Sequence, residues 1–128
     1  MPHHMLTLLD IDPSLILPLI RRGAEMKDKK IVTRTLENQT LVLVFEKSST
    51  RTRISFEVAI HELGGRSLFM TPNESQLGRS EPLKDTSRCI SRYAQGMVVR
   101  TFAQENLRQL ARYAHVPVIN ALSDSYHP

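Results

Sequence analysis

Short apolar runs that alternate with helical patterns constrain the fold of this chain most strongly. Four runs are almost wholly apolar and too short for buried helices, and they cover residues 41–45, 67–70, 97–100 and 116–122. Segments with apolar residues at helical spacing lie between them. Strands that are apolar on both faces are typical of a parallel sheet covered on both sides. The sequence therefore predicts an α/β domain of three layers, with a four-stranded parallel sheet flanked by helices on both faces.

Polar signals mark where the helices start and stop. Asp12-Pro13 suits the cap and first turn of a helix that we expect to continue to about Lys29. Gly64-Gly65 suits the end of a helix that follows the first apolar run. Two further helices are expected over residues 83–94 and around residues 107–114.

The turn after the first apolar run carries three hydroxyls and two arginines, in the sequence Ser49-Thr50-Arg51-Thr52-Arg53. The free backbone N–H groups and the positive dipole end of a starting helix favour an anion there. Arginine forks match phosphate oxygens in pairs. We therefore expect a bound anion in preference to a simple helix cap with solvated arginines. The turn differs from the common nucleotide loops, because the chain has neither G-x-x-x-x-G-K-[ST] nor G-x-G-x-x-G.

Two further polar residues follow apolar runs. Arg100 ends the third run, and His127 comes after the fourth. Ligands bind outside the carboxyl ends of the strands in open parallel sheets, so both residues would share one rim with the Ser49–Arg53 turn. An edge arginine that reaches solvent and a solvated histidine near the terminus are the alternatives, and the residues alone leave both open.

The charge balance favours a small anionic ligand. A net charge of +4 over 128 residues suits nucleic acid, a membrane surface or a small anion. The basic stretch 27–30 is interrupted by Asp28, and only 5% of the residues are aromatic. We therefore predict no nucleic-acid partner. No apolar run approaches membrane-spanning length, so we expect one cytoplasmic domain without membrane contact.

Cysteine and metal-ligand patterns add little chemistry. The single cysteine, Cys89, cannot form an internal disulfide, and it is expected to be a buried thiol on the apolar face of the third helix. His61 and His115 are expected at the surface. Since no group of His, Cys, Asp or Glu has the spacing of metal ligands, we predict no metal and no other cofactor.

The motif resembles the carbamoyl phosphate site of the aspartate and ornithine carbamoyltransferases, in which Ser-Thr-Arg-Thr-Arg is followed by Ser-Phe-Glu. Here residues 49–53 are followed by Ser55-Phe56-Glu57. The resemblance extends from about Leu6 to the last residue, and it is strongest to the ornithine enzymes. The segments that match their pattern are Phe45-Glu46-Lys47, Ser75-Gln76-Leu77-Gly78-Arg79 with Glu81, Asp85-Thr86, Leu122-Ser123-Asp124 and Tyr126-His127-Pro128.

The resemblance implies transfer of a carbamoyl group from carbamoyl phosphate to ornithine, giving citrulline and phosphate. It assigns the phosphate to four residues, Ser49, Thr50, Arg51 and Thr52. It assigns the carbamoyl oxygen to Arg100 and His127, with help from the Thr52 hydroxyl. Carbamoyl phosphate is already activated, so positioning and charge stabilisation would suffice without a protein nucleophile.

The resemblance also implies a larger assembly. Family members have two domains, and this sequence corresponds to the first, so the ornithine-binding domain is expected to be absent. Gln76 would reach from a neighbouring subunit into the site of a homotrimer, unless residues 71–82 form an ordinary surface loop. A carbamoyltransferase for another amine, such as aspartate or putrescine, and a non-catalytic module that binds carbamoyl phosphate or phosphate are the alternatives.

Overall fold

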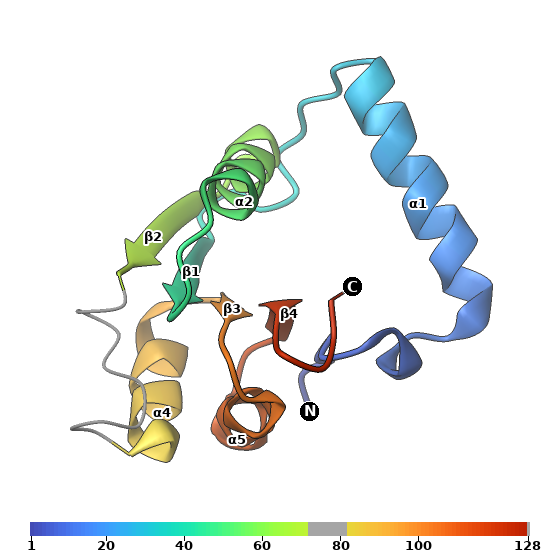
Figure 1. The fold of residues 1–128 in the computed structure, drawn as a ribbon. Helices are drawn as coiled ribbons and strands as arrows, with labels where there is room; N and C mark the ends of the chain where they lie inside the picture. Colours follow the sequence, from blue (N-terminus) through green and yellow to red (C-terminus); the bar gives the residue numbers. More distant parts are fainter. Residues whose placement is uncertain (72–81, 128) are drawn as a thin grey trace.

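A computed structural model describes residues 1–71 and 82–127 as an α/β domain around one parallel sheet (Figure 1). The sheet has four strands in the order β2-β1-β3-β4. This result confirms the predicted fold class. The elements in chain order are η1 (Leu8–Asp10), α1 (Pro13–Asp28), β1 (Thr40–Phe45), α2 (Thr50–Glu62), β2 (Arg66–Met70), α4 (Leu83–Tyr93), β3 (Gly96–Arg100), α5 (Gln104–Tyr113) and β4 (Val118–Leu122).

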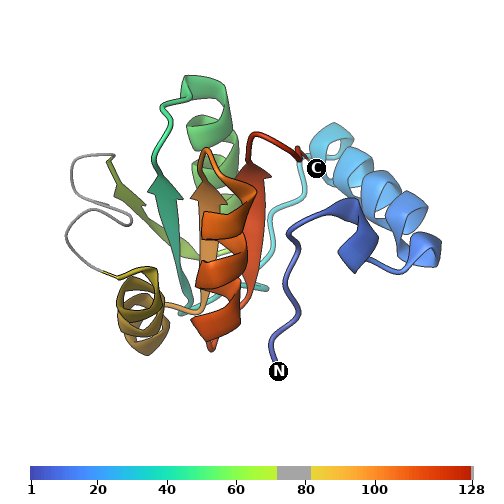
Figure 2. The ribbon, with the colours of Figure 1, turned by 60° about the horizontal axis from the view of Figure 1, so that its bottom comes forward.

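Helices cover both faces of the sheet, as predicted. Figures 1 and 2 show α2 on one face and α4 and α5 on the other. The chain passes from β1 to β2 on one side, then crosses back to place β3 on the other side of β1. The loops after β1 and β3 therefore flank the point where the strand order reverses, where open α/β sheets bind ligands.

The side chains of the central strands alternate between two cores. Val42 and Val44 of β1 pack with α4 and α5, in one cluster with Leu107 and Leu110. Leu43 and Phe45 point to the opposite face and pack around Ile60 of α2. Each fully buried Leu, Val or Phe contributes about 1.5–3 kcal/mol, so the two clusters fix β1 from both sides. This explains why the apolar runs of the sequence show no alternation.

Helix α2 begins and ends at specialised residues. Ser49 is its N-cap, so the Ser49–Arg53 motif forms the cap and first turn of the helix, directly before the apolar pattern that begins at Ile54. Gly64 follows the helix with φ +82°. A Cβ atom there would lie 3.0 Å from the Arg34 Cα atom. Both the left-handed backbone and this close approach require glycine.

The prediction that Cys89 is a buried thiol was wrong, because its side chain is exposed. Helix α4 buries a face that includes two polar residues, Thr86 and Ser87, beside Leu83 and Ile90. The Ser87 hydroxyl donates a hydrogen bond of 2.6 Å to the Leu110 carbonyl, which makes its burial inexpensive. The prediction from apolar residues alone put Cys89 on the buried face of α4, whereas that face runs through Thr86 and Ser87.

Helix α1 lies apart from the sheet (Figure 1). Its bounds agree with the prediction within one residue, and Asp12 caps it by accepting a 2.9 Å hydrogen bond from the Ser14 amide. None of its residues is buried, and Leu17 and Ile20 are each about 60% exposed. The helix therefore adds nothing to the two sheet cores.

The N-terminal segment covers the outer edge of β4. Met5 donates to the Val118 carbonyl at 2.9 Å and accepts from the Asn120 amide at 2.8 Å. Next to this bridge, Nδ1 of His4 accepts a hydrogen bond of 3.1 Å from the Val118 amide. These contacts pair an otherwise open strand edge.

The His4 contact predicts a pH dependence of stability. Burial lowers the pKa of His4 below its usual value of 6.5, against a raising effect of Asp10. The folded state therefore binds fewer protons than the unfolded state as pH falls through 6.5, and this part of the stability is lost on acidification. We expect the stability difference between wild type and His4→Ala, measured by urea unfolding, to shrink from about pH 7.5 to about pH 5.5. His115→Ala, which removes an exposed histidine, is the control, and a difference independent of pH would contradict the assignment.

Candidate functional site

The cap of α2 leaves backbone donors free. Ser49 Oγ accepts a hydrogen bond of 3.3 Å from the Thr52 amide and donates one of 3.0 Å to the Thr52 hydroxyl oxygen. The amides of Thr50 and Arg51 have no acceptor among the residues that the structure describes. Both lie at the positive end of the helix dipole, so the turn presents two unpaired N–H groups to an anion.

Arg100 joins this turn from the neighbouring strand. Parallel pairing puts Phe45 opposite Arg100, so the ends of β1 and β3 lie side by side. Arg100 Nη1 donates a hydrogen bond of 3.1 Å to the Thr52 hydroxyl oxygen. Its Nε atom is buried and has no hydrogen-bond partner within the described ranges. A buried charged donor without an acceptor is costly, which indicates a place for a ligand atom.

The Thr52 hydroxyl is set up to donate a hydrogen bond of its own. Its oxygen accepts from both Ser49 and Arg100. A hydroxyl has one proton and two acceptor lone pairs, so these contacts use the acceptor capacity and leave the proton free. The structure thus brings Ser49, Thr52 and Arg100 into one hydrogen-bonded group. This group can still donate hydrogen bonds to a ligand.

The two arginines of the motif have different environments. The Arg53 guanidinium lies 3.6 Å from the centre of the Phe69 ring, and its Nε is 3.4 Å from the Glu57 carboxylate. Arg51 is exposed and forms no ion pair with the described residues. Arg51 therefore has no carboxylate partner among the described residues, whereas Arg53 packs α2 against β2.

Contacts that sequence reasoning missed fix the ends of β1 and β3 together. The Thr101 hydroxyl donates a 3.0 Å hydrogen bond to the Glu46 carboxylate, and the Glu46 amide donates to the Arg100 carbonyl at 2.8 Å. Thr101 is fully buried. A polar residue directly after an apolar run was the available signal, since Glu46 follows Phe45. These two hydrogen bonds of Glu46 hold the end of β1, and with it the α2 turn, beside Arg100.

His127 lies in the loop after β4. It is exposed, and with Tyr126 and η1 it lines a hollow of about 150 Å³. The structure gives it no hydrogen bond to Arg100 or to the α2 turn. Its loop is tied to the loop after β3, because the Asp124 amide donates to the Phe102 carbonyl at 2.7 Å. Gln76 lies outside the described residues.

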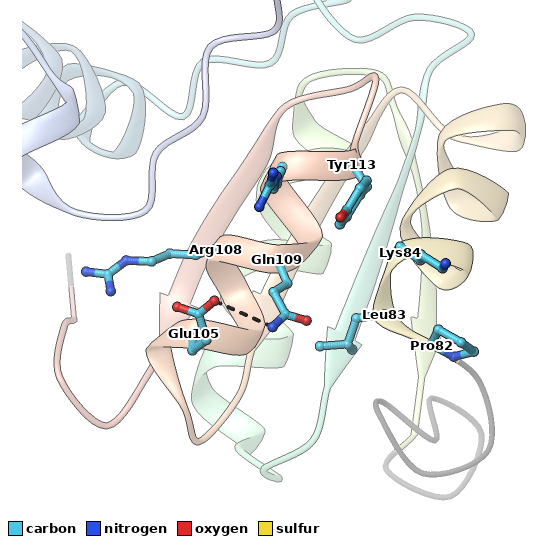
Figure 3. A pocket seen from close by; sticks show the side chains of 8 residues that line it. Pro82, Leu83, Lys84, Glu105, Arg108, Gln109 and Tyr113 are labelled. Atoms are coloured by element: carbon cyan, nitrogen blue, oxygen red, sulfur yellow. Dashed lines mark hydrogen bonds between the residues drawn. The ribbon is translucent and has the colours of Figure 1, made fainter.

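A second hollow lies between α4 and α5 and contains none of the predicted site residues (Figure 3). Its volume is about 560 Å³. Lys84 and Arg112 line it together with Glu105, which accepts a hydrogen bond of 3.5 Å from Gln109. In Figure 3 the Arg108 side chain points away from α4. Charges of both signs line this hollow, and it offers no buried unpaired donor comparable to Arg100.

Metal-ligand clusters and membrane-spanning helices are both absent from residues 1–71 and 82–127. Within these ranges, no three side chains of His, Cys, Asp or Glu come close enough to hold a metal ion. No helix of the described ranges has the length and apolar character of a membrane span. The part of the site that the structure describes around the start of α2 is built from hydroxyls, backbone amides and arginines.

Comparisons with known proteins identify what the chain is similar to. A family model for the aspartate/ornithine carbamoyltransferase carbamoyl-P binding domain matches residues 3–128. Ornithine carbamoyltransferases of Oleidesulfovibrio alaskensis and Nitratidesulfovibrio vulgaris are 51% and 53% identical over 128 residues, covering 100% of this chain and 43% of each relative. The crystal structure of an anabolic ornithine carbamoyltransferase from Campylobacter jejuni has a TM-score of 0.93 at 46% identity, over 100% of this chain and 41% of that one. The chain thus spans less than half the length of these relatives.

The hydrogen bond between Arg100 and Thr52 predicts energetic coupling. A double-mutant cycle with Arg100→Met and Thr52→Val, measured by urea unfolding, should give a coupling energy of about 1 kcal/mol. Thr50→Val is the matched control, because Thr50 is an exposed threonine of the same turn, and its effect should add to that of Arg100→Met. Additive effects for Thr52→Val would contradict the contact.

Proposed function

The chain belongs to the aspartate/ornithine carbamoyltransferase family, over its carbamoyl-P binding domain, and from this premise we propose that it binds carbamoyl phosphate at the start of α2. The observation that carries the proposal is the group formed by Arg100 and Thr52. Among the described residues, the Arg100 Nε atom is buried without a partner, and the turn that holds Thr52 also carries the Thr50 and Arg51 amides, which have no acceptor. Such a group is complementary to a ligand with a phosphate and a carbonyl oxygen.

In the proposed complex, the phosphate lies on the first turn of α2. The Thr50 and Arg51 amides donate to its oxygens. The Ser49 hydroxyl joins them once it turns away from the Thr52 oxygen, to which it donates in this structure, and the one free proton of Thr52 serves the carbamoyl carbonyl. The Arg51 guanidinium adds a charge that no described carboxylate neutralises. Because Arg53 is occupied by Phe69 and Glu57, only one arginine of the motif serves the phosphate.

The carbamoyl carbonyl oxygen points toward Arg100, His127 and the Thr52 hydroxyl. When the acceptor amine attacks the carbonyl carbon, these donors stabilise the negative charge that develops on the oxygen. The bond between this carbon and the bridging oxygen then breaks, the attacking nitrogen passes one proton to the departing phosphate, and the protonated phosphate leaves. The first turn of α2 holds the charge of the departing phosphate, so no serine or cysteine of the chain needs to form a covalent intermediate.

We propose ornithine as the acceptor, which would give citrulline. The relatives with about half of their residues identical are named ornithine carbamoyltransferases, and the segment around Gln76 fits that subgroup. Contacts with the amino acid would come from the part of those relatives that this chain does not span. A non-catalytic domain that only binds carbamoyl phosphate is the second candidate, because the donors at the start of α2 are complementary to this ligand without an acceptor amine.

We further propose a homotrimer in which Gln76 completes the site of a neighbouring subunit. The support is the resemblance of the segment Ser75–Arg79 to the ornithine enzymes and the polar, proline-bounded composition of residues 72–82. A segment of this composition need not pack on its own core, so it can reach a neighbour.

Arg51→Leu should abolish most of the affinity for the ligand without unfolding the domain. Its side chain is exposed, so its loss removes a phosphate contact and no core packing. We expect affinity for inorganic phosphate and carbamoyl phosphate, measured by calorimetric titration, to fall by about tenfold or more, with an unchanged circular dichroism spectrum. Arg92→Leu removes an exposed arginine of α4 and serves as the control. Equal affinity in Arg51→Leu and wild type would show that the anion binds elsewhere.

The trimer proposal predicts complementation between two inactive variants. In a catalytically competent polypeptide that contains this domain, Gln76→Ala and Arg51→Leu chains would be dissociated, mixed in equal amounts and reassembled. A site then needs Arg51 from one chain and Gln76 from its neighbour, so random assembly restores about a quarter of the wild-type activity. Mixed trimers that stay as inactive as their parents would show that Gln76 does not act across an interface.

A further inference from the structure

The loop after β4 rests on buried polar side chains. Asn120 is 1% exposed, Ser123 is 5% exposed and Gln104 is 8% exposed. Asn120 Nδ2 donates to the Leu6 and Tyr126 carbonyls at 2.9 and 3.2 Å, and its Oδ1 accepts from the Leu122 amide at 2.9 Å. One amide side chain thus joins the N-terminal segment, the end of β4 and the loop that follows it.

This network holds the backbone of Tyr126 from both sides. The Tyr126 carbonyl accepts from the Ser123 amide at 2.9 Å, in addition to its bond with Asn120. The Tyr126 amide donates to Ser123 Oγ at 3.1 Å. Since Tyr126 directly precedes His127, these bonds fix the point at which the His127 side chain starts.

The same network reaches the loop that carries Arg100. The Ser123 hydroxyl donates to Gln104 Oε1, and Gln104 is the first residue of α5, four positions after Arg100. Beside this bond, the Thr101 amide donates to the Leu122 carbonyl at 3.0 Å. The loops after β3 and β4 are therefore joined by side-chain and backbone bonds together.

This network contains a buried polar group that lowers the stability of the fold. Gln104 Nε2 is buried without a hydrogen-bond partner among the described residues. A buried amide with an unused donor costs about 1–3 kcal/mol, and apolar side chains of similar size would fill the same space without that penalty. The bonds of Ser123 hold the loop after β4 through Tyr126 and join it to the loop after β3 through Gln104, which indicates a positioning role.

We propose that Ser123 and Gln104, with Asn120, are positioning residues that hold His127 at a fixed place relative to Arg100. The inference rests on the proposed function, in which Arg100 and His127 share the carbonyl oxygen of carbamoyl phosphate. In this arrangement the network adds nothing to phosphate binding itself, which belongs to the first turn of α2. Loosening it therefore lowers affinity for a ligand with a carbonyl group and spares affinity for phosphate.

The test compares two probes on the same chain. Inorganic phosphate lacks the carbonyl group, whereas phosphonoacetamide keeps the phosphorus group, the carbonyl and the amide, with a methylene in place of the bridging oxygen. Calorimetric titration gives the ratio of the two dissociation constants. We expect Ser123→Ala to lower the preference for phosphonoacetamide by about tenfold, with the phosphate affinity unchanged.

A matched control separates positioning from general destabilisation. Ser87→Ala removes another buried serine hydroxyl, one that bonds the Leu110 carbonyl between α4 and α5, so it should lower stability and keep the wild-type ratio. Gln104→Met removes the acceptor of the Ser123 hydroxyl while it preserves side-chain volume, and should change the ratio as Ser123→Ala does. Gln104→Met decides the question alone if Ser123→Ala fails to fold.

The outcomes distinguish this inference from the proposed function. If the wild-type chain binds both probes and the folded variants keep its ratio, the positioning role is overturned while the binding site stands. If the wild-type chain binds neither probe, the proposed function itself fails. A parallel loss of affinity for both probes in Ser123→Ala would show that the network supports the whole site and does not specifically position His127.

Discussion

The parallel pairing of β1 with β3 is the constraint on which the rest of the structure depends. The register sets Phe45 opposite Arg100, so the turn after β1 and the last residue of β3 are neighbours although 48 positions separate Thr52 from Arg100. Two separate cores hold β1, one against α2 and one against α4 and α5. A slip of such a strand by one residue would exchange the side chains of its two faces and disrupt the packing of both cores. The binding geometry therefore follows from the packing of apolar side chains that never touch a ligand.

The site concentrates hydrogen-bond donors and leaves them incompletely paired. In this structure the Ser49 hydroxyl bonds the amide and the hydroxyl of Thr52 in the first turn of α2. The Thr52 oxygen accepts two hydrogen bonds, from Ser49 and from Arg100. The Nε of Arg100 stays unpaired, as do the amides of Thr50 and Arg51 among the described residues. Donors that folding has already placed lose little conformational entropy when a ligand binds. The entropy cost of arranging them belongs to folding and does not weaken binding. Unpaired buried donors of this kind cost stability, which is the expense of presenting them to an anion.

Periodicity and turn chemistry predicted most of the fold, and they failed where polar residues are buried. The four strands and the first turn of α2 follow from apolar runs and capping residues that act locally. Cys89 was misplaced because α4 buries Thr86 and Ser87, whose hydroxyls no hydrophobic pattern reveals. The position of Arg53 over Phe69 depends on which strand lies beside α2, and sequence separation hides this pairing. The network of Gln104 and Ser123 was also missed, because each residue alone is typical of a loop.

A titration of the isotope-labelled chain with inorganic phosphate, followed by proton–nitrogen correlation spectra, tests the central claim most directly. The account predicts the largest shifts at the backbone amides of Thr50 and Arg51 and at the Nε–H group of Arg100, because these are the donors that lack an acceptor. Smaller changes are expected at the loop that carries His127. Largest shifts around Lys84 and Arg112, in the hollow between α4 and α5, would contradict it if the α2 turn stayed unchanged.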